Sequence, residues 1–328
     1  MGPFRLASRG SPLALRQTGL IADALREAHP GLEVEVEVVR TQGDDLSVSL
    51  DQIGGQGVFV TEVEAAVAQG RADAAVHSAK DMTSTMAPGL VLAAVPPRAD
   101  ARDGLVGCAW ADLPPGALIA TGSARRRAQL AYLRPDLSFT EIRGNMERRV
   151  SRGEDGSVSA VVVAVAAMDR LGWMHRLTDI LDPVDVLPQA GQGAIAVQCR
   201  AGDADVLSLL VAIDDPRSHR AVRAERAVLA ALGGSCTVPV GAYAETVPAP
   251  AGSPAPTHLR VQGLLASGDG RVVIRMTRCG DDPESVGADV AHALLVDGGG
   301  SGLEGFDAAA LAHRGAPTPP RWRTAAPR

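Results

Sequence analysis

The chain has 328 residues, of which 46% are apolar and only 3% aromatic, and its formal net charge is −6. This length suggests two or three domains, whose cores must be built mainly from Val, Leu, Ile and Ala. The negative charge argues against a general nucleic-acid-binding protein. No apolar run is long enough to cross a bilayer, and the N-terminus, Met1 to Gly10, lacks the apolar core of a signal peptide.

The N-terminal part is predicted to alternate strands and helices. Ser11 before Pro12 is a favourable helix start, and residues 33–39 alternate apolar and acidic side chains as a half-exposed strand does. The predicted strands are 4–7, 33–39 and 73–77, and the predicted helices are 11–29 and 58–69. The last of these strands ends at His77, and open α/β sheets bind ligands at such strand ends.

A second α/β block is predicted after Pro96-Pro97. Its strands are expected near 105–108, 117–120, 138–142 and 158–165, and its helices near 124–133, 145–152 and 166–171. A glycine-rich crossing at 187–193 then leads to a strand at 194–199. The remaining chain is expected to form a small α+β unit with helices at 216–232 and 283–296 and strands at 240–245, 258–266 and 271–278. From Gly298 the composition predicts a flexible tail with no core to join.

Several chemistries have no support in the sequence. There is no P-loop, no GxGxxG that opens a helix, no GxSxG elbow and no HExxH motif. The four cysteines and seven histidines are scattered without CxxC or ligand spacing, so neither a disulfide framework nor a metal site is expected. The cytosol is the expected location.

The segment His77-Ser78-Ala79-Lys80-Asp81 places polar groups and an acid directly after a buried strand. It fits an active site, but an ordinary strand exit would give the same pattern. Lys80 is the only lysine among 32 basic residues. It marks either a place that needs a compact ammonium or a drift in base composition.

Eight arginines lie between Arg125 and Arg152 against three acidic residues, a local surplus of five positive charges. The turn Thr121–Ser123 places hydroxyls and backbone amides at a helix N-terminus, which is a natural anion site, and Arg143 precedes a second such turn. Arginine binds carboxylates or phosphates through paired hydrogen bonds. A solvated charged face is the alternative, although two clusters at successive turns favour a binding site.

Cys236 lies in the loop Gly233-Gly234-Ser235-Cys236-Thr237, where a thiol is exposed more readily than in a strand. Cys199, in an apolar strand, is expected in a core instead. On pattern alone, Cys236 is either an incidental loop thiol or a functional one.

Taken together, the chain resembles the hydroxymethylbilane synthase family, also called porphobilinogen deaminase. Seven segments carry the resemblance, in order from about Leu6 to Tyr243. They are ASRGSPLAL (7–15), GGQGVFVTEVE (54–64), RADAAVHSAKD (71–81), TGSARRRAQL (121–130), IRGNMERRV (142–150), LPQAGQGAIAVQCR (187–200) and GGSCTVPVGAYA (233–244). Any one segment alone is weak, but seven in order are highly specific.

The resemblance implies an α/β fold with two periplasmic-binding-protein-like α/β domains plus a small α+β C-terminal domain. The implied boundaries are 1–96 with 190–212 for domain 1, 97–189 for the arginine-rich domain 2, 213–297 for domain 3 and 298–328 for the tail. The implied enzyme condenses porphobilinogen stepwise, with loss of ammonia, into the linear tetrapyrrole hydroxymethylbilane. It builds this chain on a dipyrromethane cofactor, as a cytoplasmic monomer with no nucleic-acid or membrane partner.

The resemblance also implies roles for individual residues. Asp81 matches the catalytic acid, and Cys236 matches the cysteine that carries the cofactor through a thioether. The other implied cofactor-binding residues are Lys80, Thr121, Ser123, Arg125 and Arg126. The implied substrate-binding residues are Arg9, Ser11, Gln17, Phe59, Arg143 and Arg149. Each pyrrole carries an acetate and a propionate, which suits such a cationic set.

The chain departs from the family pattern in places. Gln52 and Gln56 stand where the family has lysine, and Met82-Thr83 replaces the usual Val-Pro after the acid. Two alternatives therefore stay open: a catalytically altered paralogue, and a non-catalytic small-anion-binding protein of the same fold. The lack of a signal peptide and the retention of Asp81 and Cys236 count against them.

Overall fold

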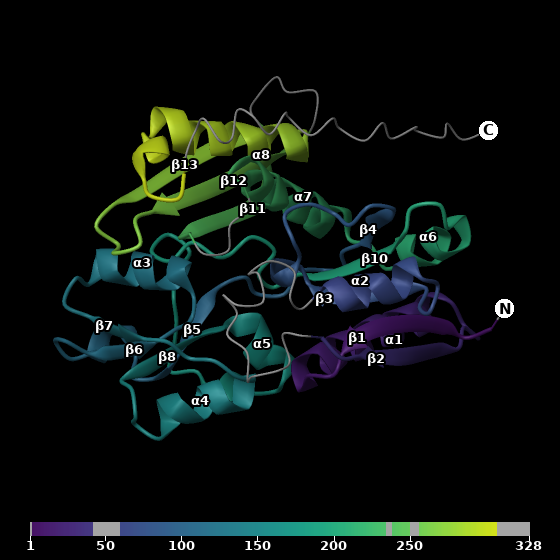
Figure 1. Cartoon of the computed structure of the whole chain (residues 1–328), viewed down its shortest axis with the longest axis horizontal. Coiled ribbons are helices and arrows are strands. Elements are labelled where there is room, and N and C mark those ends of the chain that lie inside the picture. Colours follow the sequence, from purple (N-terminus) through teal and green to yellow (C-terminus); the bar gives the residue numbers. More distant parts are fainter. Residues whose placement is uncertain (1, 42–59, 234–237, 250–255, 307–328) are drawn as a thin grey trace.

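The structure is a computed structural model that describes residues 2–41, 60–233, 238–249 and 256–306 (Figure 1). The strands within these ranges form two five-stranded sheets and one three-stranded sheet. In Figure 1 the three-stranded sheet and helix α8 lie at the top, above the other two sheets. No helix among the described residues is long and apolar enough to cross a membrane.

The first sheet has the strand order β2-β1-β3-β10-β4. Its strands are β1 (Phe4–Arg9), β2 (Val34–Val39), β3 (Ala74–Ser78), β4 (Leu90–Ala94) and β10 (Ile195–Arg200). Strand β1 is parallel to β2 and β3, whereas β10 is antiparallel to β3 and β4. The sheet is covered by helices α1 (Pro12–Ala28), α2 (Thr61–Ala68) and α6 (Ala204–Val211).

The second sheet repeats this arrangement in the order β7-β6-β8-β5-β9. Its strands are β5 (Asp103–Gly107), β6 (Leu118–Ala120), β7 (Ser138–Thr140), β8 (Ala160–Ala164) and β9 (Asp179–Ile180), and its helices are α3 (Ala124–Leu133), α4 (Met146–Glu154) and α5 (Val165–Arg170). Strand β6 is parallel to β7 and β8, and β5 is antiparallel to β8. The fourth strand in the spatial order of each sheet is antiparallel to the third. This strand is β10 in the first sheet and β5 in the second, and each is the first strand after the chain crosses from the other sheet.

The third sheet is antiparallel and consists of β11 (Val240–Pro248), β12 (Thr257–Ala266) and β13 (Val273–Gly280). Helices α7 (Pro216–Ala231) and α8 (Pro283–His292) pack against each other and against this sheet. Their shared core includes Val228, Val261 and Val290, all fully buried. The predicted fold class, two α/β domains and a small α+β domain, is confirmed.

The described C-terminal residues correct one prediction. Beyond α8, the chain continues as a π-helical turn at Ala293–Asp297 and a 3-10 turn at Gly300–Gly302. Phe306 is only 2% exposed and belongs to the core around α7 and α8. The prediction of a flexible tail that starts at Gly298 is therefore wrong for residues 298–306, because the buried Phe306 side chain anchors them. The other predicted domain boundaries are kept as a proposal.

Local capping explains where the helices nearest the candidate site begin. Ser11 accepts a hydrogen bond from the Ala14 amide at α1, Ser123 does so from Arg126 at α3, and Asn145 from Arg148 at α4. Each of these side chains satisfies a backbone donor that the first turn leaves open. Strands β4 and β9 and helix α6 were not predicted from the sequence, because they are short and their apolar residues show no clear periodicity.

Candidate functional site

Asp81 lies at the end of a short 3-10 turn, η2 (Ala79–Asp81), that follows β3. The turn is held because the Ala79 amide donates to the Ala194 carbonyl, 3.0 Å away, in the second crossing. Gly191, with φ +73°, presses against the turn so closely that an added Cβ would lie 2.8 Å from the Ala79 carbonyl carbon. The Asp81 side chain is exposed and makes no hydrogen bond or ion pair with the part of the chain that the structure describes.

Lys80 is half-buried beside Asp81, and its Nζ lies 3.5 Å from the Oε1 of Gln192. Desolvation and the nearby Arg126 guanidinium lower the pKa of Lys80 to about 8, while the negative charges of Asp81 and Asp103 oppose this shift. Among the described residues, the Lys80 amine therefore lies near both positive and negative groups. At slightly alkaline pH, part of the Lys80 population is neutral.

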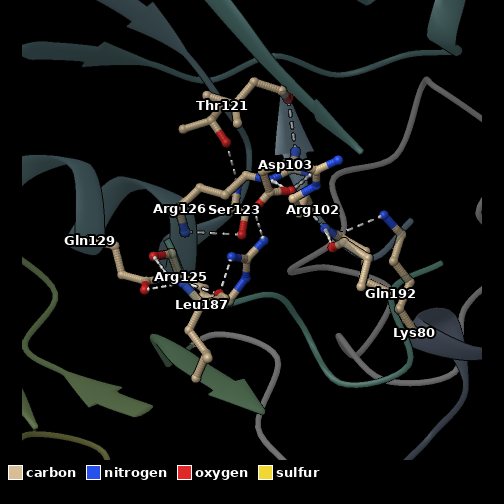
Figure 2. Close-up of polar contacts among 12 residues, drawn as sticks. Lys80, Arg102, Asp103, Thr121, Ser123, Arg125, Arg126, Gln129, Leu187 and Gln192 are labelled. Carbon is tan, nitrogen blue, oxygen red and sulfur yellow. Dashed lines mark hydrogen bonds and ion pairs between the residues drawn. The ribbon is translucent and has the colours of Figure 1, made fainter. Parts of the chain in front are cut away.

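Arg125 and Arg126 lie in the first turn of α3 and are both buried, and they share the carboxylate of Asp103 on β5 (Figure 2). Arg126 donates to Oδ1 through Nε and Nη2 at 3.0 and 2.7 Å, and Arg125 donates to Oδ2 through Nη2 at 2.8 Å. Burial alone would raise the pKa of Asp103, but the two guanidinium groups hold it far below its ordinary value. Most of the donors of these two arginines are thus bound inside the protein.

The hydroxyls predicted as an anion site at this helix start also have internal roles. Thr121 Oγ1 accepts a hydrogen bond from the Ser123 amide at 3.2 Å, and Ser123 Oγ accepts one from the Arg126 amide at 3.4 Å. Each hydroxyl uses one of its two lone pairs to hold the turn, and its hydrogen can still be donated to an anionic ligand.

Arg149 and Arg143 lie at the next turn. Arg149 is half-buried, and its Nε donates to the Gly144 carbonyl at 2.9 Å. Desolvation and Arg126 lower the pKa of Arg149, and Asp81 raises it, so this side chain lies within electrostatic reach of both. Arg143 is exposed, with its nearest anionic partner, Glu141, at 3.7 Å.

Three predicted residues lie around β1 and α1. Ser11 caps α1, and Arg9 ends β1 in a half-buried position. Gln17 is buried, and its amide nitrogen lies 2.9 Å from the hydroxyl of Ser78. The bond links α1 to the end of β3, three residues before Asp81. The predicted site residues Phe59 and Cys236, as well as Gln52 and Gln56, lie outside the described residues.

Sequence reasoning missed the buried polar residues that link these groups. Asp103 accepts from two arginines and Gln192, and Glu225 on α7 accepts from Arg98, Gly191 and Ala244. The only hint was an acid directly before an apolar strand, which is a common pattern. Across the described residues no group of three His, Cys, Asp or Glu side chains could hold a metal ion.

Comparisons with known proteins decide the family. Residues 4–208 match a family model described as "Porphobilinogen deaminase, dipyromethane cofactor binding domain", and residues 219–296 match its C-terminal domain. The chain belongs to the porphobilinogen deaminase family. The predicted resemblance, the enzyme class and the dipyrromethane cofactor are thereby confirmed.

Individual porphobilinogen deaminases match over nearly their whole length. The one from Roseiflexus castenholzii is 46% identical over 304 residues, covering 91% of this chain and 97% of the relative. That of Syntrophobacter fumaroxidans is 42% identical, with 90% and 95% covered, and that of Stenotrophomonas maltophilia K279a is 44% identical, with 92% and 98% covered.

The described residues fit the cofactor of this deaminase family. Dipyrromethane carries two pyrroles, each with an acetate and a propionate, and therefore needs cationic donors. Of the cofactor-binding residues that the resemblance implies, Lys80 carries a half-buried ammonium, and the buried Nε of Arg125 has no hydrogen-bond partner in the described parts of the chain. The exposed carboxylate of Asp81 can accept a hydrogen bond from a pyrrole N–H.

Proposed function

We propose that this chain condenses porphobilinogen into hydroxymethylbilane with Asp81 as the catalytic group. The observation that carries the assignment is the contrast around Asp81: an exposed carboxylate without a partner among the described residues, close to the cations Lys80 and Arg149. A carboxylate in this setting is available to a ligand.

The carboxylate suits the chemistry of the substrate. When ammonia leaves the aminomethyl group of porphobilinogen, a pyrrole cation remains. Asp81 can stabilise this cation while it accepts a hydrogen bond from the pyrrole N–H. A charge pair at about 4 Å with an effective dielectric of about 20 is worth roughly 4 kcal/mol. This corresponds to around a thousandfold in rate, at about 1.4 kcal/mol per tenfold.

The surrounding cations are proposed to bind the carboxylates of substrate and product. Arg143 and Arg149 would bind substrate from the second sheet, together with Arg9, Ser11, Gln17 and Phe59 from the first. Lys80, Thr121, Ser123, Arg125 and Arg126 would bind the cofactor. The bound dipyrromethane supplies the anchor on which the chain is built, and Cys236 is the proposed attachment point.

The proposed function is tested by turnover of porphobilinogen in Asp81→Asn holoprotein. We expect a loss of about a thousandfold with the fold intact. Asp112→Asn is a matched control, because Asp112 is also an exposed acid at the third position of a 3-10 turn, η3 (Trp110–Asp112), away from the site. Near-normal turnover in Asp81→Asn would reject Asp81 as the catalytic group.

The cofactor attachment is tested by intact mass. Purified protein is expected to exceed the mass of the chain by two pyrrole units, and Cys236→Ser is expected to abolish this excess. An unmodified mass from a host that makes porphobilinogen would favour a non-catalytic binding protein.

The protein is further proposed to act in the cytoplasm as a monomer, without nucleic-acid or membrane partners. A net charge of −6 supports the exclusion of nucleic acid. Light scattering of the purified holoprotein tests the oligomeric state, and a mass of two chains would reject the monomer.

A further inference from the structure

Asp103 is an acid near the candidate site that accepts four side-chain hydrogen bonds. Its side chain is fully buried at the start of β5, where the chain enters the second sheet. Oδ1 accepts hydrogen bonds from Arg126 and from Gln192 Nε2, and Oδ2 accepts one from Arg125. One carboxylate therefore ties together a helix start and a crossing between the sheets (Figure 2).

The remaining donors fix both guanidiniums in place. Arg126 Nη1 donates to the Val162 carbonyl of β8 at 2.8 Å, and Arg125 Nη1 donates to the Leu187 carbonyl at 2.6 Å. Because each planar group is bound to two different structural elements, it cannot rotate without breaking a buried hydrogen bond. The pair keeps one net positive charge after Asp103 is counted.

Gln192 extends this arrangement to Lys80. Its Nε2 donates to two acceptors, the Asp103 carboxylate at 2.8 Å and the Ala101 carbonyl at 2.7 Å. These two acceptors determine which way the amide faces, since its oxygen could not replace the nitrogen there. The oxygen is left to face the Lys80 ammonium, at 3.5 Å.

We propose that Asp103 and Gln192 are positioning residues, which hold Arg125, Arg126 and Lys80 in one geometry across the boundary between the first two sheets. That these three cations bind pyrrole carboxylates rests on the proposed function. Asp103 and Gln192 are too deeply buried to meet a ligand themselves, with no exposed surface. They act through the three cations.

A purely structural ion pair would stabilise the fold without acting on Lys80. The two roles are separable because Lys80 is the only lysine of the chain. Holoprotein grown with isotope-labelled lysine gives a single side-chain NMR signal, whose pH titration reports this ammonium alone. The charged groups that act on it are Asp81, Asp103, Arg125 and Arg126.

Both variants are expected to lower the titration midpoint of Lys80. Asp103→Asn removes a negative charge that favours the ammonium, and Gln192→Leu removes the oxygen that faces it. Asp100→Asn is the matched control, because Asp100 lies in the same crossing but pairs with Arg102 near the surface. We expect it to leave the midpoint unchanged. If Gln192→Leu and Asp103→Asn titrate like the control, the proposal is wrong.

Steady-state kinetics provide the second readout. Gln192→Leu leaves the Asp103 ion pairs in place, so it decides the question even if Asp103→Asn does not fold. We expect its kcat/KM for porphobilinogen to fall on the order of tenfold, the effect of one hydrogen bond to a charged group. Unchanged kcat/KM would overturn the positioning role.

The two proposals can fail independently. If the Lys80 midpoint falls in Asp103→Asn and Gln192→Leu while Asp81→Asn keeps full turnover, the catalytic role of Asp81 is rejected and the positioning role of Asp103 and Gln192 stands. If the midpoint is unchanged in those two variants while Asp81→Asn is inactive, the positioning role is rejected and the catalytic role of Asp81 stands.

Discussion

Two aspartates near the candidate site have opposite surroundings. Asp81, at the end of the 3-10 turn that follows β3 of the first sheet, has an exposed side chain without a partner among the described residues. Asp103, at the start of β5 in the second sheet, is fully buried and bound by two arginines and a glutamine. The same side chain is thus an exposed charge in one place, which we propose faces a ligand, and an internal counter-ion in the other. What decides between these roles is burial and the supply of donors.

The largest expected effect is on stability. Asp103→Asn leaves two buried guanidiniums short of their counter-ion, so the free energy of unfolding should fall by about 3–5 kcal/mol. Asp81→Asn should change it by less than about 0.5 kcal/mol, because the side chain is exposed. Urea unfolding of both variants measures this, and equal losses would erase the contrast between the two acids.

A somewhat smaller loss is expected at Glu225, a second buried acid. It accepts two hydrogen bonds from Arg98, at 2.5 and 3.1 Å, and one each from the amides of Gly191 and Ala244. Glu225→Gln should cost about 3 kcal/mol, since it leaves the Arg98 charge uncompensated while keeping the shape. Urea unfolding is the measurement. Arg223→Gln, on the same helix but in an exposed pair with Glu284, is the control.

The next effect depends on pH and concerns His77, buried on β3 before Asp81. Desolvation lowers the pKa of His77 to about 4, with Arg226 and Arg9 adding to the shift and Gln198 opposing it. The unfolded chain therefore binds more protons between pH 4 and about 6.5, so stability should fall as the pH drops through that range, by up to about 3 kcal/mol.

Unfolding measured across this range should show a weaker fall in His77→Gln than in the parent. The difference between the two proteins is the quantity to use, because the buried Glu64 has a raised pKa and acts with the opposite sign. Parallel curves would mean that His77 does not titrate on unfolding.

The smallest effect separates capping from binding at Ser11. Ser11→Ala removes the N-cap of α1 and should cost about 1 kcal/mol of stability. Ser11→Asp keeps the cap, yet its charge would repel the carboxylates of the substrate. We expect it to raise KM for porphobilinogen with little change in unfolding, and an unchanged KM would remove Ser11 from the substrate-binding set.

Much of this protein follows from local sequence. Helix starts at Ser11, Ser123 and Asn145 were readable because a cap acts within three residues of itself. The strand that ends at His77 followed from its apolar run, and the ordered segments identified the family. Short elements such as β9 were missed because two residues carry no period.

The environment of each charge was decided only by the tertiary structure. The sequence supplied Arg125 and Arg126 as cations, but their partner Asp103 lies more than twenty residues away and reaches them because β5 enters the sheet beside β8. Gln192 joins them from a crossing 89 residues beyond Asp103. Periodicity describes neighbours on one helix or strand, whereas the burial that separates Asp103 from Asp81 depends on which elements pack together.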